Sequence, residues 1–220
     1  LDRSSAASDV YKRQDMSNAC RESRSLLAIQ LIEEQLRVLP VSIAMILQPA
    51  QAGKSETGTA PVLMLHRKKK QAKTGSAGNI VVDNAQATTV LDFQASSNTL
   101  HESPLQKATY LRVVISNALL AVGMFLKEHD LGSMRTPEIQ FLDHVMDAIL
   151  NANTFKVPQG YIPMATFDGL VIDSSLNGKL LFGDGQQEGF MESGDAVALL
   201  QWLAHYLHKE RHFVSGGDAG

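Results

Sequence analysis

The sequence lacks the features that hold small or fibrous proteins together by covalent links or by repetition. Its 220 residues include a single cysteine, Cys20, so a disulfide scaffold, which needs paired cysteines, is excluded. The 16 glycines do not recur at every third position, which excludes a collagen, and a hydrophobic content of 44% excludes a disordered chain. A lone cysteine is compatible with a reducing compartment, and we expect a cytoplasmic protein.

A large excess of charge and a long hydrophobic run are absent as well. The formal net charge of −3 gives no reason to expect general attraction to nucleic acid. The most apolar stretch, Val113 to Leu126, is shorter than a bilayer span of about 20 helical residues, so we predict a buried helix and no membrane association. No charged, apolar and cleavage regions of a signal peptide occur at the start, which predicts no secretory signal.

The beginning of the chain does not read as part of a fold. Residues 4–14 have the sequence SSAASDVYKRQ, which looks like translated adapter sequence, and Met16 is then the expected true start. We therefore expect residues 1–15 to be an artefactual tail. Residues 16–212 are predicted to form a single domain, and residues 213–220 a loose tail.

In the first half, the spacing of apolar residues predicts one amphipathic helix, Ser25–Val38, ended by Pro40. The short apolar run Val41–Leu47 favours a strand. Residues 48–103 carry few large apolar side chains, and we expect an irregular, partly mobile excursion of strands and loops. Its expected strands are Val62–Leu65, Ile80–Val82 and Thr89–Phe93.

The second half predicts a helical core over residues 104–210. Ser103 before Pro104 is a typical helix start, and the helix should run to about Glu128. Thr136-Pro137 starts the next helix by the same logic, and the short linker predicts that the two helices pack antiparallel. Ser193 opens a last helix, whose expected buried residues are Val197, Leu199, Leu200, Leu203 and Leu207.

Between these helices the sequence predicts a small β-hairpin. Its strands are expected at Leu170–Ile172 and Lys179–Phe182, with the turn at Asn177-Gly178. The predicted fold class is therefore mainly α (α+β): an antiparallel helical bundle with a small hairpin and an N-terminal excursion.

Two patterns bear on phosphate or nucleic-acid binding. Gly53-Lys54-Ser55 follows an apolar run as a Walker A loop would, but Gln48 stands where that motif needs glycine, so a plain loop is favoured. A basic run contacts phosphates in many nucleic-acid-binding proteins, but without interleaved aromatic residues a solvated, charged strand end is the favoured explanation of this one. Its residues are Arg67, Lys68, Lys69, Lys70 and Lys73.

Other titratable residues give no catalytic or metal site. His205, His208 and His212 share one helical face, but no carboxylate or cysteine of suitable spacing joins them, so exposed histidines are expected. The three aspartates near the expected hairpin are interpreted as turn residues, namely Asp168, Asp173 and Asp184. We predict no catalytic residue, no metal and no cofactor.

The two helices between Leu105 and Phe155 carry a resemblance. LRVVISNALLAVGMFLKEHDL followed by RTPEIQFLDHVMDAILNANTF resembles the helical hairpin of HEPN-type domains, which are small prokaryotic helical bundles of toxin–antitoxin and abortive-infection proteins. The later phrases FDGLVIDSSLNGKLLFGD and SGDAVALLQWLAHYL resemble the segment after that hairpin in stand-alone members, so the likeness covers residues 105–207, about half the chain. The resemblance implies a homodimer formed through the hairpin.

Active HEPN-type proteins are metal-independent ribonucleases that use an arginine, a polar residue and a histidine on the second helix. In such a site, histidine exchanges protons with the ribose hydroxyl or the leaving oxygen, and arginine stabilises phosphorane charge. By position, Met146 replaces the arginine, Asp147 is the polar residue and Asn151 replaces the histidine. Methionine cannot hold a phosphate and asparagine cannot transfer a proton, so the resemblance implies a degenerate motif.

These observations lead to three functional hypotheses. The first is a catalytically degenerate HEPN-like protein, a binding or regulatory module for RNA or protein in a prokaryotic defence or toxin–antitoxin setting. The second is an RNA-cleaving enzyme with a relocated site that uses His144 or the terminal histidines. The third is a nucleic-acid-binding protein that works through the basic run of residues 67–73.

Overall fold

The structure is a computed structural model, which describes residues 3–47, 62–66, 88–92, 103–132, 136–158 and 163–215, and side chains within 19–47, 103–132, 136–158 and 163–211. Its elements are α1 (Arg3–Leu47), β1 (Val62–His66), β2 (Thr88–Asp92), α3 (Pro104–Glu128), α4 (Pro137–Leu150), β3 (Ala165–Phe167), β4 (Leu170–Ile172), a 3-10 turn (Ser174–Leu176) and α5 (Ser193–Ser215). The fold is mainly helical with small antiparallel strand pairs, which confirms the predicted fold class.

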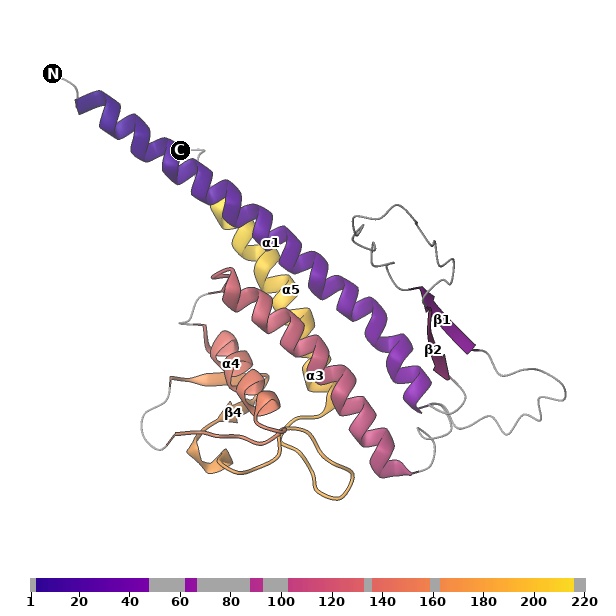
Figure 1. The fold of residues 1–220 in the computed structure, drawn as a ribbon. Coiled ribbons are helices and arrows are strands. Elements are labelled where there is room, and N and C mark those ends of the chain that lie inside the picture. Colours follow the sequence, from indigo (N-terminus) through magenta and orange to yellow (C-terminus); the bar gives the residue numbers. More distant parts are fainter. Residues whose placement is uncertain are drawn as a thin grey trace, which may run out of the picture.

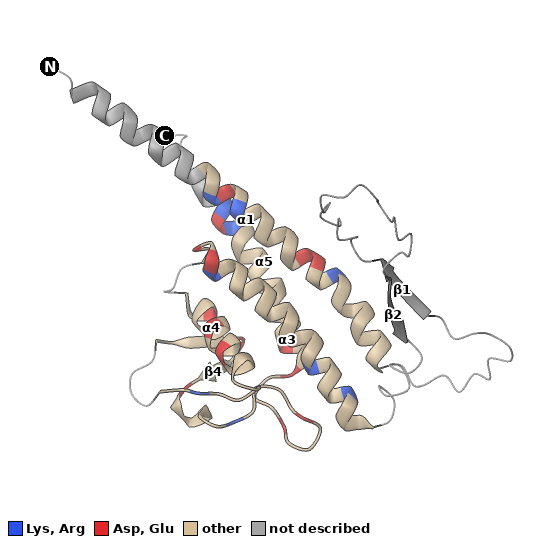
Figure 2. Cartoon of the chain, in the orientation of Figure 1, with Lys and Arg blue, Asp and Glu red and all other residues tan. Residues whose placement is uncertain are grey.

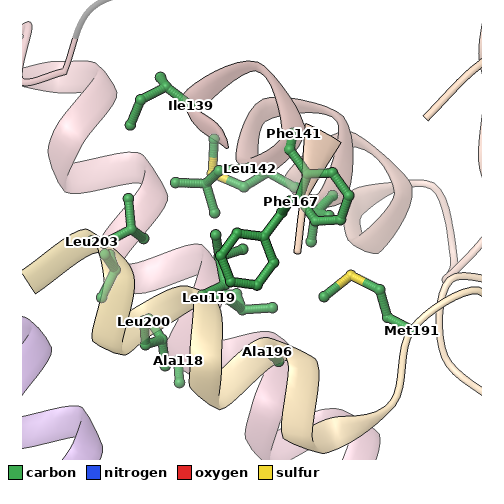
Figure 3. Close-up of a cluster of buried hydrophobic side chains, with 14 of the residues drawn as sticks. Ala118, Leu119, Ile139, Phe141, Leu142, Phe167, Met191, Ala196, Leu200 and Leu203 are labelled. Atoms are coloured by element: carbon green, nitrogen blue, oxygen red, sulfur yellow. The ribbon is translucent and has the colours of Figure 1, made fainter. Parts of the chain in front are cut away.

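The long helices form the bundle, and α4 joins it to the small strands. Helix α1 packs along α5 and α3, while α3 also contacts α4 and α5 (Figure 1). Helix α4 lies mainly against β3. Figure 3 shows where the layers meet, with Leu119 of α3, Phe141 of α4, Phe167 of β3 and Leu200 of α5 in one buried cluster. This cluster is the hydrophobic core of the described part of the chain.

Helix α1 differs from the prediction at Pro40. The expected helix end at Pro40 and the expected strand Val41–Leu47 are both wrong, because the helix continues through Pro40 to Leu47. The reason is burial, since inward residues follow steps of four and three on both sides of the proline. This inward row is Ser25, Ile29, Ile32, Leu36, Leu39, Ile43 and Ile46. Tertiary packing on α3 and α5 thus outweighs the cost of one interior proline.

Helices α3 and α4 begin where the sequence predicted. The Ser103 hydroxyl accepts a hydrogen bond from Gln106 N at 3.2 Å and caps α3. The end of α3 lies beside the start of α4, because Gly132 borders the Ile139 side chain. Further back along α3, Gly123 borders the Met146 side chain further along α4. The two contacts run in opposite directions along the helices, as expected for antiparallel packing.

Helix α3 is longer than the apolar stretch suggested. The expectation of no membrane association was based on the length of the stretch from Val113 to Leu126. Helix α3 as a whole has 25 residues, so its length does not support that expectation. By length and composition alone α3 is apolar enough to cross a membrane, and 33% of its most apolar window is buried in the fold. Its inward side chains Leu119 and Val122 are buried in the bundle. The absence of membrane association stays a prediction.

The β-hairpin is one turn earlier than predicted. Strand β4 matches the expected Leu170–Ile172, but it pairs with β3 and not with residues 179–182. The turn is Asp168-Gly169, with φ of 46° and 85°, and two positive φ values are what a tight hairpin turn requires. Asn177 has φ −54° and ψ 122° before Gly178 at φ 81°, a type II turn that does not match strand twist.

The expected strands of the excursion are found in part. β1 and β2 pair antiparallel, with Val62 opposite Asp92 and His66 opposite Thr88. This agrees with the predictions at 62–65 and 89–93 within one residue at each end. The expected strand 80–82 and the expected mobility of the excursion lie outside the described residues. At the other end of the chain α5 continues to Ser215, further than the tail predicted from residue 213.

Candidate binding cleft between α3 and residues 182–193

The positions of the degenerate motif do not form a shared cleft. Met146 is 4% exposed and lies under Gly123, so its side chain belongs to the α3–α4 contact. Asp147 is exposed. Asn151 is the C-cap of α4, and its Nδ2 donates to the Thr154 carbonyl at 2.8 Å. The structure therefore gives Met146 a packing role and Asn151 a role in ending the helix.

Predicted basic and histidine positions are likewise dispersed. The basic run at 67–73 and the loop at 53–55 lie outside the described residues. His205 and His208 are exposed on α5, and the side chain of His212 is not described. His208 Nε2 lies 3.8 Å from Glu33 Oε1 of α1. Among described residues no group of three histidine, cysteine, aspartate or glutamate side chains could hold a metal ion.

The aspartates near the strands are turn residues, as expected. Asp168 adopts the positive φ of the hairpin turn. Asp173 Oδ1 accepts from Ser175 N at 2.8 Å, and hydrogen bonds from Ser175 lower the pKa of Asp173. Asp184 Oδ1 accepts from Gln187 N at 2.7 Å and Gln186 N at 2.9 Å. Each carboxylate thus stabilises a local turn.

The residues that line a cleft are different ones. A cleft of about 340 Å³ lies between the N-terminal half of α3 and the segment 182–193 that leads into α5. Phe182 and Met191 form a buried apolar base, and Leu111 of α3 forms part of the opposite wall. Polar side chains line the rest of the cleft, namely Arg112, Gln186, Gln187, Glu188, Glu192 and Ser193.

Glycines allow the 182–193 segment to fold back on itself beside α3. A Cβ atom on Gly189 would lie 2.2 Å from Gly183 N and 2.4 Å from the Phe182 carbonyl carbon, which are backbone atoms that cannot move aside. Gly185 has φ 88°, and a Cβ there would approach Leu105 Cα of α3 to 3.4 Å. Close backbone approach therefore fixes the wall of the cleft.

The cleft carries more negative than positive charge. Backbone N–H groups of Gln187 and Gln186 lower the pKa of Asp184, and the nearby Arg112 guanidinium lowers it further. Arg112 therefore has Asp184 as a neighbour of opposite charge. Glu188 and Glu192 are exposed at the rim, and no ion pair is seen for either within the described part of the chain. The rim thus favours a cationic ligand.

Sequence reasoning missed this cleft, although a signal was present. The run Gly183-Asp-Gly-Gln-Gln-Glu-Gly189 places polar residues between three glycines, and apolar residues flank it. Such a run predicts a tight loop, but it does not reveal that Arg112, some 70 residues earlier in the chain, lies opposite. A further hollow of about 470 Å³ lies where the end of α3 meets the start of α4, between Gly132 and Ile139.

Comparisons with known proteins add no assignment. No family model, no curated protein and no solved structure matches this chain.

Proposed function

We propose that this chain is a catalytically inactive HEPN-like binding module, which holds a short basic segment of a protein partner in the cleft between α3 and residues 182–193. The carrying observation is the cleft of about 340 Å³, with its apolar base and the exposed carboxylates of Glu188 and Glu192 at its rim. The prokaryotic defence or toxin–antitoxin setting that the resemblance implies belongs to the same proposal.

The chemistry of the cleft selects the partner class. The aliphatic stem of a lysine or arginine fits an apolar base such as Phe182 and Met191, while its charged end reaches the rim. Glu188 and Glu192 attract that end, and they repel phosphate groups. Among the described residues that line the cleft, Arg112 is one cation against the two carboxylates of Glu188 and Glu192. These features favour a protein partner over RNA.

The absence of catalysis is supported by the residues at the motif positions. Met146 is buried against Gly123 and presents no charge to solvent. Asn151 uses its side-chain amide to bond the Thr154 carbonyl in the turn that follows α4. Neither side chain can do the proton transfer or charge stabilisation that the ribonuclease reaction needs.

Binding is tested by NMR with two capped peptides of equal length, one lysine–leucine and one glutamate–leucine. We expect the lysine peptide to shift backbone amides of Arg112 and residues 183–193, and the glutamate peptide to leave them unchanged. The double variant Glu188→Gln/Glu192→Gln should weaken binding of the lysine peptide about tenfold. Its matched control, Glu128→Gln/Glu138→Gln, removes the same charge outside the cleft and should bind normally.

Two outcomes would overturn the proposal. Equal binding by the Glu188/Glu192 variant and by its control would show that the cleft is not the site. Cleavage of RNA by the purified protein, lost on Asn151→Ala, would show that the chain is an active ribonuclease, and loss on substituting His144 would favour the relocated site.

A further inference from the structure

The side of α1 that faces away from the bundle carries its own regular row of residues. The row alternates steps of four and three, which is the spacing of a coiled-coil seam. It comprises the exposed residues Leu27, Glu34, Val38, Val41 and Met45, together with Leu31, which lies at the edge of the row and also packs against the core. The inward row that packs on α3 and α5 lies on the opposite side of the helix, so α1 has two seams and the bundle uses one of them.

The outward row is unusually apolar for a surface. Leu27 is 55% exposed, Val38 57%, Val41 62% and Met45 48%. Between Ser25 and Leu47 the only charged residues are Glu33, Glu34 and Arg37. In Figure 2, α1 is charged at the start of its described part and again in one short red and blue band further along, and the helix on both sides of this band is uncharged. Contiguous exposed apolar surface marks a protein–protein interaction site in many soluble proteins.

We propose that this outward face binds the same face of a second copy of the chain, with the two α1 helices antiparallel. A two-fold axis crosses the outward face at the height of residue 36 along the helix, so that Leu27 lies opposite Met45 and the exposed edge of Leu31 opposite Val41 of the second copy. Such an interface is self-complementary, because the apolar residues are distributed equally on both sides of the charged centre. It uses α1, in contrast to the α3–α4 hairpin that the resemblance implies.

Charge decides the orientation. In an antiparallel pair Glu34 lies beside Arg37 of the second copy, and the same contact forms again by symmetry. A parallel pair would place Glu34 opposite the identical glutamate within the seam, which is repulsive. Within one chain Arg37 Nη1 already lies 2.7 Å from Glu34 Oε1, and a guanidinium has enough donors to bind a second carboxylate. The centre therefore favours the antiparallel arrangement.

Disulfide cross-linking tests this arrangement directly. In a Cys20→Ser background, Leu27→Cys and Met45→Cys are combined and the protein is oxidised. Residues 27 and 45 are about 27 Å apart along one helix, so a disulfide between them must join two chains. We expect a covalent dimer from the double variant and none from Leu27→Cys alone. Dimers of the Leu27→Cys variant would show a parallel pair and overturn the proposal.

Two further measurements separate this face from other surfaces. Val41→Glu should raise the dimer dissociation constant at least about tenfold in analytical ultracentrifugation. Its matched control, Val113→Glu on the exposed side of α3, should leave that constant unchanged. Glu34→Arg should also weaken the dimer, and addition of Arg37→Glu should restore it. A protein that stays monomeric at about 100 μM overturns the proposal. That result is also the one expected if residues 48–102 of the same chain cover this face. Disruption by Val113→Glu alone would do so as well.

Discussion

The side-chain amide of Asn153 is hydrogen-bonded to both backbone polar groups of Phe182. Its Oδ1 accepts from Phe182 N at 3.0 Å, and its Nδ2 donates to Phe182 O at 2.8 Å. Leu181 N also donates to the Asn153 carbonyl at 2.9 Å. Asn153 is 7% exposed and has φ 65°, a conformation that asparagine tolerates better than most residues. This residue therefore joins the end of α4 to the base of the cleft.

Replacement of Asn153 by alanine should destabilise the fold strongly. It removes both partners of the Phe182 backbone and leaves alanine at a positive φ. We expect a loss of about 2–4 kcal/mol in the free energy of unfolding, measured by urea denaturation. The control Asn151→Ala removes one partly exposed hydrogen bond to Thr154 O and should cost about 0.5–1 kcal/mol. Equal losses in the two variants would contradict this role of Asn153.

Local chemistry made the helix starts predictable. Ser103 and Pro104 begin α3 because a hydroxyl acceptor and a fixed φ satisfy a helix start without any tertiary contact. Thr136-Pro137 and Ser193 were located from the same residue types, although the Thr136 side chain makes no capping hydrogen bond. Asn153 could not be recognised as a key residue, because its partner Phe182 is 29 positions away.

Features decided by tertiary packing were predicted wrongly. Pro40 was taken as a helix end, although the inward row of α1 continues with Leu39 and Ile46. Asp168-Gly169 and Asn177-Gly178 are both turn dipeptides, and only their φ angles show which one forms the hairpin. The cleft combines α3 with a segment far along the chain, so no local pattern contains it.

Replacement of Gly123 by alanine should destabilise the α3–α4 contact. A Cβ at this position would lie only 2.1 Å from Met146 Sδ, which is buried. Overpacking costs about 1–3 kcal/mol, and the better helix propensity of alanine returns up to about 1 kcal/mol. We therefore expect a net loss of about 1–2 kcal/mol in urea denaturation.

The matched control for this substitution is Gly194→Ala in the first turn of α5. A Cβ there meets no atom within 4 Å, so the change should be neutral or slightly stabilising. Combining Gly123→Ala with Met146→Ala should cost less than the sum of the two single variants. Strict additivity would show that the two side chains do not compete for the same space.

Asp143 predicts a small pH dependence of stability. Burial raises the pKa of Asp143 above its ordinary value of 3.8, and the Lys127 ammonium opposes that rise. Because the folded-state pKa is the higher one, this contribution is fully present below about pH 3.8 and is lost as the pH rises through the folded pKa.

Asp143→Asn removes the titration while it keeps the shape of the side chain. The variant should gain up to about 0.5 kcal/mol over the unmodified protein near pH 7, a value reduced by solvent screening. Near pH 3 the gain should vanish, because the aspartate is then protonated in both states. Lys127→Gln should act in the opposite direction and increase the loss of stability with pH. Urea midpoints at the two pH values measure both effects, and a gain that is the same at both would contradict this account.

Pro40 should make the fold less stable than alanine at the same position would. Pro40 is exposed inside α1, near its C-terminal end, so its ring adds little packing, and it has no N–H to donate to the carbonyl four residues earlier. Pro40→Ala should restore that hydrogen bond and raise the free energy of unfolding by about 1–3 kcal/mol. Because dimer formation makes stability depend on concentration, both proteins are compared by urea denaturation at the same concentration.

The control Pro104→Ala, at the first helical position of α3, should change little, because no intrahelical donor is needed there. A loss of stability in Pro40→Ala would show that α1 does not continue through this residue, and the outward row of α1 would then not extend to Met45.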